Sequence, residues 1–442
     1  MAQENEELNQ RRQRREQMKA HYQKQQRNLI IRLIAVAVVL LVSVVAIVVL
    51  SLPKAPEPPA ATTTPTVTEG TDGSDPTADT TPGTTASETE PTEETSPGNT
   101  TVIRFAAAGD LNVTDQVVAA GGVAMNYGPA FVDVLPLLAD ADLTALNLEG
   151  NVVGVPYGTA TKSVPQSLLT ALKNAGVDLI QMANSCSIYN GVAGLSQTLE
   201  GIRAAGLESV GAFASREEFR RTGGYTIRTV KGVKIAIVGF TKGMDSMGLP
   251  AGSEDCVNVL YKDYDTTYQK VDTEGIEAVL DAVAEEKPDI TIALVHWGSE
   301  FNDKISSSQE TIEKLLLRNG VSAIIGTHSH FVQQMKHDPE NGTFVAYSLG
   351  DFFGDGERSG TAYSVILELE ITKDHETGIT KVTDFTTTPI FTVHEEEKPL
   401  RVLRIKEAMY AYELSYVDRV SEETYKDMVY ALERIEERIK GE

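Results

Sequence analysis

The chain has 442 residues, of which 41% are hydrophobic and 23% charged, a globular balance that excludes whole-chain disorder and a multi-span membrane protein. Its formal charge of −24 is uneven: residues 1–52 carry +4, residues 53–100 carry −8 and residues 101–442 carry −20. A body this acidic would be repelled by phosphate backbones, so no nucleic-acid partner is expected. Two cysteines are too few for a disulfide scaffold or a cysteine-based zinc module.

An apolar run near the N-terminus predicts a membrane anchor. Residues 33–52 contain no charged side chain, and a helix of this length spans roughly 30 Å, the thickness of a bilayer core. Eight basic residues lie within 1–32, so the positive-inside rule predicts a basic cytoplasmic tail and an extracellular main domain. A cleaved signal peptide is the competing interpretation, but its apolar region is normally about 7–15 residues. We therefore expect a single-pass protein of the cell membrane.

Residues 53–100 consist mostly of Thr, Pro, Ser, Gly and acidic residues. Such a segment cannot bury enough apolar surface to offset the entropy of ordering, so a disordered linker is predicted here.

From residue 101 onward, short apolar runs alternate with helical periodicity, which favours a layered α/β domain over 101–395. The expected strands are Val102–Ala108, Asp142–Leu148, Val177–Met182, Val233–Phe240, Ile290–Val295, Ala323–Ile325 and Thr343–Ser348. The expected helices are Pro129–Ala139, Gln166–Ala175, Leu195–Ala205, Thr273–Glu286 and Ser307–Asn319. Residues 362–371 and 379–389 predict an antiparallel pair. The C-terminal segment, 396–442, is expected to form two amphipathic helices joined near Ser421.

Side chains that favour metal ions stand at the ends of several expected strands. They are Asp110 after the first strand, Glu149 at the end of the second, His296 after Ile290–Val295, and His328 with His330 after Ala323–Ile325. Imidazole and carboxylate together suit Mn, Fe or Zn. Singly, a Gly-Asp after a strand is more often a turn, and one histidine is more often an ordinary hydrogen-bonded side chain. Their common position at strand ends favours a site for one or two divalent cations.

The order of these motifs resembles the CapA family, which is associated with capsule and poly-γ-glutamate synthesis and whose domain looks like a calcineurin-type metallophosphatase. The resemblance covers roughly Val102–Val393. It rests on Gly109-Asp110, Asn147-Leu148-Glu149, His296-Trp297-Gly298 with Glu300, Gly326–His330 with Gln333, and Tyr347–Gly350. Asp351 follows where the family has Asn. The resemblance implies an α/β/β/α sandwich of metallophosphatase type, with the anionic polymer or its synthase subunits as partners.

The resemblance also implies roles for individual residues. Asp110, Glu149 and His330 would hold one metal, and Glu149 would bridge to a second metal held with His296 and His328. The three histidines would be the catalytic residues of a hydrolase.

Departures from the family pattern put catalysis in question. Where the family has Asn-Asn-His, this chain has Asn184-Ser185-Cys186, which replaces a metal ligand and the histidine beside the nucleophile. Tyr189 stands in the place of a downstream Asp. For Cys186, a buried inert thiol is the default interpretation, and a nucleophile, a soft ligand or a disulfide with Cys256 are alternatives.

Three functional hypotheses follow. The preferred one is a cell-surface CapA-like protein that serves polymer synthesis or export with weakened catalysis. The second is an active metal-dependent phosphoesterase or other hydrolase, and the third is a non-catalytic extracellular binding module.

Overall fold

The computed structural model describes residues 99–395, 398–417 and 419–441, which belong to one compact unit, Pro97–Glu442. The predicted cytoplasmic tail, the membrane helix at 33–52 and nearly all of the linker lie outside the described residues. Within the described ranges, no helix combines the length and the apolar character needed to cross a bilayer.

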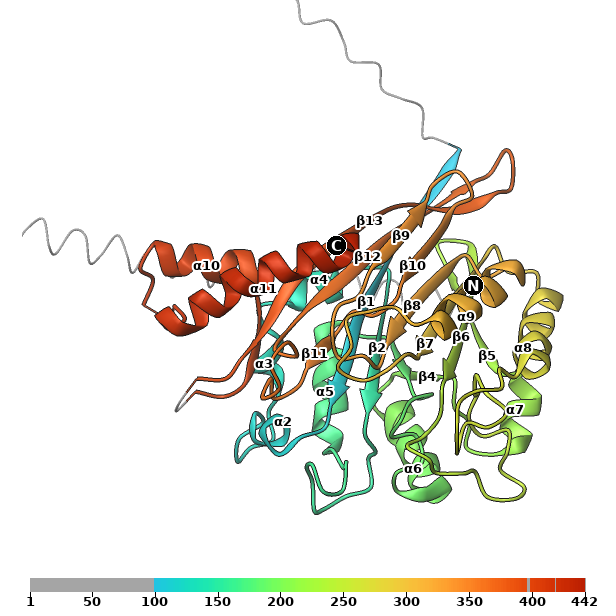
Figure 1. The fold of residues 1–442 in the computed structure, drawn as a ribbon, viewed down its shortest axis with the longest axis horizontal. Coiled ribbons are helices and arrows are strands. Elements are labelled where there is room, and N and C mark those ends of the chain that lie inside the picture. Colours follow the sequence, from blue (N-terminus) through green and yellow to red (C-terminus); the bar gives the residue numbers. More distant parts are fainter. Residues whose placement is uncertain (1–98, 396–397, 418, 442) are drawn as a thin grey trace, which may run out of the picture. The chain divides into compact units, whose positions relative to one another are not determined.

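The unit contains two mixed β-sheets (Figure 1). The first has the order β14-β13-β12-β1-β2-β3-β4, with β11 paired to β1. Its strands are β1 (Thr100–Asn112), β2 (Leu143–Glu149), β3 (Leu179–Gln181), β4 (Glu208–Val210), β11 (Asp351–Phe353), β12 (Tyr363–Asp374), β13 (Thr380–Val393) and β14 (Arg401–Arg404). The second has the order β5-β6-β7-β8-β10-β9. Its strands are β5 (Tyr225–Val230), β6 (Val233–Thr241), β7 (Ile290–His296), β8 (Ala323–Thr327), β9 (Met335–Asp338) and β10 (Thr343–Ala346).

The central strands of both sheets are parallel and buried on both faces. All seven residues of β2 and all seven of β7 are buried, in keeping with the mainly apolar sequences of these strands. Parallel neighbours bring their carboxyl ends to the same edge of a sheet. Here β1, β2, β3 and β4 run parallel, as do β6, β7, β8 and β10, so each sheet gathers several strand ends.

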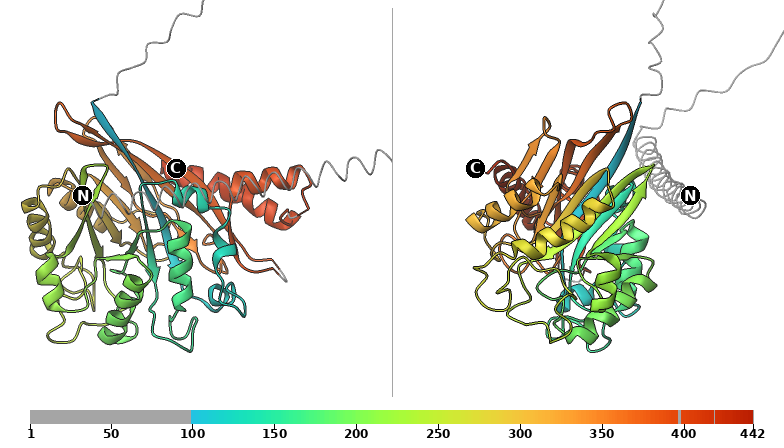
Figure 2. Two further views of the ribbon diagram at one scale, coloured as in Figure 1. Left: turned by 180° about the vertical axis from the view of Figure 1, so that it is seen from behind. Right: turned by 90° about the vertical axis from the view of Figure 1, so that its right-hand side faces the viewer.

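Helices cover the outer faces of both sheets (Figure 2). The helices are α2 (Asp115–Ala119), α3 (Gly128–Phe131), α4 (Leu135–Ala139), α5 (Gln166–Ala175), α6 (Gly191–Ala204), α7 (Arg216–Thr222), α8 (Thr273–Glu285), α9 (Ser307–Arg318), α10 (Ile405–Glu413) and α11 (Glu422–Lys440). Apolar residues of α5 and α6 pack on the first sheet, and those of α8 and α9 pack on the second. A third apolar cluster lies between the two sheets, and it includes residues of α10 and α11, which therefore pack on the inner side of the first sheet and not on an outer face. The layers are therefore α/β/β/α, as expected.

Most of the predicted elements are confirmed. Residues 362–371 and 379–389 lie in the antiparallel pair β12–β13, and the two terminal helices are α10 and α11, the second capped by Ser421. One expectation needs correction, because residues 129–139 form two short helices with a turn between them. Helices α2 and α7 and strands β4, β5, β9, β11 and β14 were not predicted, mainly because most of them are too short to leave a clear periodicity in the sequence, and β14 lies where only helices were expected.

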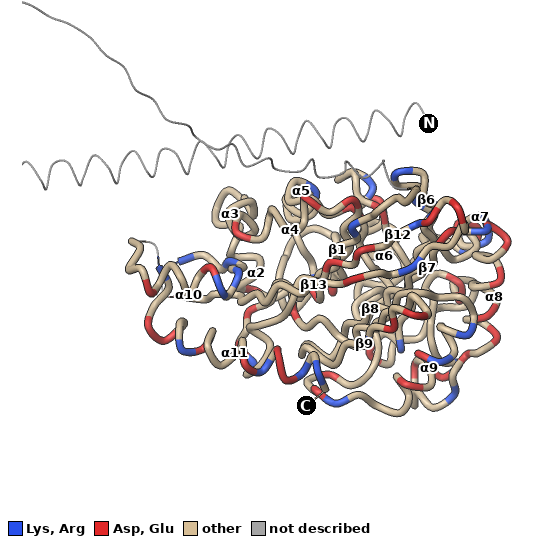
Figure 3. Tube along the Cα trace, turned by 90° about the horizontal axis from the view of Figure 1, so that it is seen from above, with Lys and Arg blue, Asp and Glu red and all other residues tan. Residues whose placement is uncertain are grey.

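Both signs of charge lie along α7, α9, α10 and α11, whereas α8 is acidic (Figure 3). Helix α8 carries four acidic residues and no basic one. Part of the negative charge of the domain therefore lies on α8, one of the helices that cover the second sheet.

Candidate metal centre

The five predicted ligands come from strand ends of both sheets. Asp110 lies near the end of β1, Glu149 ends β2 and His296 ends β7, while His328 and His330 lie in the turn after β8. The register of β1 shifts between Ala107 and Asp110, and such an irregularity re-aims the side chain that follows it.

Gly109 allows β1 to approach a neighbouring loop closely. A Cβ atom at this position would lie 1.8 Å from the carbonyl oxygen of Gly350, whereas the glycine lets the backbone N–H of Asp110 donate to that same oxygen at 3.0 Å. The Gly-Asp pair at the end of the first strand therefore has a structural reason for its glycine.

The five ligands form two groups that share Glu149. The carboxylate-rich group consists of Asp110, Glu149 and His330, and the imidazole-rich group of Glu149, His296 and His328. In each group one ligand atom per residue lies within 4.8 Å of the others, and all five side chains are at most 5% exposed. The structure thus brings together the two sets that the family resemblance implies, although their role as metal ligands remains a prediction.

Two buried atoms indicate that the cluster fits a cation. Glu149 Oε1 and His328 Nε2 have no hydrogen-bond partner among the described residues. A buried polar atom without a partner costs free energy, which a bound cation would recover. Glu149 Oε1 also lies 3.5 Å from His296 Nε2, so carboxylate oxygen and imidazole nitrogen face one common point.

The surrounding polar groups fix the orientation of the ligands. Asn147 donates to Asp110 Oδ1 at 2.6 Å, and the backbone N–H of His328 donates to Asp110 Oδ2 at 2.9 Å. Thr327 Oγ1 lies 3.0 Å from His296 Nδ1. Such partners orient metal ligands and raise their affinity.

Asp351 belongs to this surrounding set, and its role was not predicted. Its Oδ1 lies 2.8 Å from His330 Nδ1, because β11 pairs parallel to β1 with Asp351 opposite Asp110. The backbones of His328 and His330 both have positive φ, +90° and +59°, a conformation that side chains other than glycine rarely adopt. The signals in the sequence were the position of Asp351 after an expected strand and its place opposite an Asn of the family motif.

Burial and mutual charge control protonation in the cluster. Burial raises the pKa of Asp110 to about 6 and that of Glu149 well above its ordinary value. Burial also lowers the pKa of His296 and His328, which keeps both imidazoles neutral and able to bind a metal. Burial opposes the charge of His330, but the nearby carboxylate of Asp351 raises the pKa of this histidine well above its ordinary value.

Ser185 and Cys186 occupy different places. Ser185 Oγ lies 3.1 Å from His296 Nε2 and 3.4 Å from His328 Nδ1, so this hydroxyl faces the imidazole-rich group. Cys186 is 3% exposed and forms no disulfide bond, and burial raises the pKa of its thiol well above the ordinary value. Cys256 is also buried and unbonded, so the disulfide alternative is not found in this structure.

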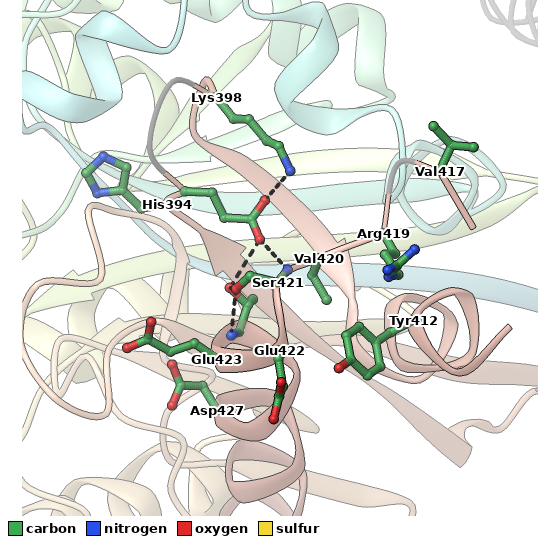
Figure 4. A pocket seen from close by; sticks show the side chains of 12 residues that line it. His394, Lys398, Tyr412, Val417, Arg419, Val420, Ser421, Glu422, Glu423 and Asp427 are labelled. Carbon is green, nitrogen blue, oxygen red and sulfur yellow. Dashed lines mark hydrogen bonds and ion pairs between the residues drawn. The ribbon is translucent and has the colours of Figure 1, made fainter. Parts of the chain in front are cut away.

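A separate cavity of about 890 Å³ lies beside the start of α11 (Figure 4). Glu395 lines this cavity and accepts hydrogen bonds from the backbone N–H of Ser421, from Thr424 and from Lys398. This cavity shares no lining residue with the metal centre, and these contacts connect the segment after β13 to the N-terminus of α11.

Comparison with known proteins shows which family and which relatives the chain resembles. Residues 104–355 match the family model described as "Bacterial capsule synthesis protein PGA_cap". The chain is 26% identical to "Capsule biosynthesis protein CapA" of Bacillus anthracis over 58% of this chain and 61% of that one. It is also 26% identical to "PGA biosynthesis protein CapA" of Bacillus subtilis (strain 168), over 57% of this chain and 63% of the relative. The matches thus span less than two thirds of either relative.

Among solved structures, the chain is similar to the calcineurin-like phosphoesterase YfkN from Bacillus subtilis. The TM-score is 0.42 at 16% identity, over 76% of this chain and 97% of that chain. The family model covers more than half of the chain and includes all five predicted ligands. The chain therefore belongs to the bacterial capsule synthesis protein PGA_cap family.

Proposed function

We propose that this protein serves the synthesis or export of a capsule-type anionic polymer such as poly-γ-glutamate, through a centre that binds one or two divalent cations and catalyses only weakly. The observation that carries the proposal is the buried cluster of Asp110, Glu149, His296, His328 and His330 within the family match. Two relatives are named for capsule or PGA biosynthesis, which supports the choice of polymer.

The ligand types suit Mn, Fe or Zn. A cation bound here would polarise a phosphoryl or carbonyl oxygen and lower the pKa of bound water. The chain itself holds the neutral imidazoles of His296 and His328, together with the carboxylates, in fixed orientations in a site with little exposure to water. Asn147, Thr327 and Asp351 supply that orientation through the hydrogen bonds described above.

The residues at the imidazole-rich group support weakened catalysis. A hydroxyl is a poorer neutral ligand than an amide oxygen, and Ser185 stands where the family pattern has Asn. The raised pKa of Cys186 keeps its thiol protonated at neutral pH, so this residue lacks the reactivity of a thiolate and cannot take over the role of a histidine in proton transfer.

The N-terminal segment supports a proposal for the location and the partners. The apolar run 33–52 and the basic residues before it support a single-pass anchor with a cytoplasmic N-terminus and an extracellular domain. In that position the domain would meet polymer-synthase subunits at the membrane and the growing anionic polymer outside it.

A second candidate function is an active metal-dependent phosphoesterase or other hydrolase. It is favoured by the unpartnered Glu149 Oε1 and His328 Nε2, since retention of two such buried atoms is costly unless a cation uses them.

Gene deletion and complementation in the source organism test the proposal. We expect loss of the gene to lower the amount of surface polymer, the wild-type gene to restore it, and the Glu149→Gln gene not to restore it. Unchanged polymer in the deletion strain would contradict the proposed function. Rapid phosphoester hydrolysis by the purified, metal-loaded chain would favour the second candidate.

A further inference from the structure

A small pocket of about 230 Å³ adjoins the imidazole-rich group. Ser185 and His328 line one part of it, and the remainder includes Lys242, Asp245 and Glu300. We propose that this pocket binds a single oxyanion group of the substrate, a phosphoryl or a carboxylate, on the Lys242 ammonium beside the metal centre. The inference rests on the proposed function and names the chemical class that the centre would act on.

The backbone and side chain of Lys242 are both held against the segment that carries His296. Lys242 directly follows β6, and its backbone N–H donates to the carbonyl oxygen of His296 at 2.8 Å. Its Nζ donates to the carbonyl oxygen of Gly298 at 3.0 Å. An ammonium has three donors, so this contact leaves two for a ligand.

The ring of Tyr268 supports the ammonium from one side. Lys242 Nζ lies 4.8 Å from the ring centroid, within the range of a cation–π contact. A Cβ atom at Gly243 would lie 2.6 Å from Cε1 of Tyr268 and 2.3 Å from the carbonyl oxygen of Tyr264. The glycine is therefore required for the ring to pack here, and the place of the lysine is fixed by its surroundings.

Among the described residues, no carboxylate lies within ion-pair distance of the Lys242 ammonium. Within the described residues, neither Asp245 nor Glu300 forms an ion pair with Lys242, although both line the pocket and influence its charge. Lys242 is also the only lysine or arginine among the described lining residues. A partly buried ammonium with free donors is suited to a charge-assisted hydrogen bond with an oxyanion.

The two carboxylates limit what the pocket accepts. Asp245 and Glu300 are exposed, and they would repel additional negative charge on a ligand. The pocket therefore favours one oxyanion group with a neutral or donor-bearing neighbour over a run of closely spaced anions. For an anionic polymer, such a group is found at a chain end or on an activated precursor.

Phosphate binding to the full-length chain in mild detergent tests the inference. Binding of inorganic phosphate, and of acetate in a parallel series, is measured by calorimetry with and without Mn²⁺. Lys242→Met keeps the length of the side chain and removes its charge, so we expect the Kd to rise about 10- to 100-fold. Asp245→Asn removes a repelling charge, and Asn tolerates the positive φ of this position, so we expect the Kd to fall a few-fold. Lys314→Met, on the exposed face of α9, is the control and should leave the Kd of both probes unchanged.

The opposite signs of the two effects are the decisive result, since general damage to the pocket would weaken binding in both variants. The inference is overturned when Lys242→Met binds both probes as the wild type does, when Asp245→Asn weakens binding equally, or when neither probe binds to the wild type. If Lys242→Met weakens the binding of phosphate alone, the pocket takes a phosphoryl group, and if it weakens the binding of acetate alone, the pocket takes a carboxylate. Failure of Mn²⁺ to bind would contradict the proposed function, while the series without metal would still test Lys242.

Discussion

The two ligand groups share Glu149 but differ in how the chain supports them. The carboxylate-rich group has an additional acidic residue, Asp351, against His330, and both oxygens of Asp110 are held by hydrogen bonds. The imidazole-rich group retains the unpartnered Nε2 of His328 and has Ser185 where the family pattern places Asn. The two groups are equally buried but differ in their surrounding polar residues, and we therefore expect them to bind cations with unequal affinity.

From this difference we predict that one group binds its cation with high affinity and the other with low affinity. The carboxylate-rich group offers two carboxylates and one imidazole in fixed orientations, which favours tight binding of a cation. The imidazole-rich group offers two neutral nitrogens, the shared carboxylate and a weakly coordinating hydroxyl. We expect its cation to dissociate first.

Removal of the shared ligand should have the largest effect. Glu149→Gln should lower the affinity of both sites by at least about 100-fold, because each loses its common carboxylate. Metal content after desalting measures this loss, and Glu285→Gln on the exposed surface of α8 is the matched control. Retention of one cation at wild-type affinity would show that Glu149 does not bridge the two groups.

Asp351→Asn should lower the cation affinity of one site and leave that of the other unchanged. The change removes the carboxylate beside His330, so the affinity of the carboxylate-rich group should fall about 10- to 100-fold while the other group is unaffected. Calorimetric titration with Mn²⁺ resolves the two sites, with Asp281→Asn on α8 as the control. An equal loss at both sites would mean that Asp351 stabilises the whole cluster and not His330 alone.

The metal-free domain should show a pH-dependent cost of burying Asp110. Its pKa is raised from 3.8 to about 6, so between these values the folded chain holds a proton that the unfolded chain has released. The free energy of unfolding therefore falls as pH rises through this range. Asp110→Asn lacks this contribution, so its stability relative to the wild type should increase by about 1–3 kcal/mol between pH 4 and pH 7.

Denaturant unfolding of both proteins in EDTA measures that difference. Lost hydrogen bonds in Asp110→Asn give a constant offset, so only the change with pH matters. A difference that stays constant from pH 4 to pH 7 would rule out the buried, protonated carboxyl.

The smallest effect is expected when the family residue is restored. Ser185→Asn should raise the affinity of the imidazole-rich group about 3- to 10-fold by supplying an amide oxygen in place of a hydroxyl. Ser185→Ala is the control, because it removes the hydroxyl without adding a ligand. If both variants bind as the wild type does, Ser185 does not limit the second site.

Much of this arrangement could be predicted from the sequence, for identifiable reasons. Buried parallel strands such as β2 and β7 are mainly apolar, and the polar residues that end them, Glu149 and His296, stand out in the sequence. Asp351 and Lys242 could not be assigned, because their roles depend on the pairing of β11 with β1 and on the packing of Tyr268 against Gly243. Those contacts join segments far apart in the chain and leave no local pattern.

The cation content of the full-length chain tests the central claim most directly. The purified protein is incubated with Mn, Fe and Zn, desalted and measured by elemental analysis, and the metal is then titrated back. The account predicts that one cation per chain survives desalting and that a second binds only at higher free metal concentration. Correctly folded protein that binds no cation under any of these conditions would contradict it.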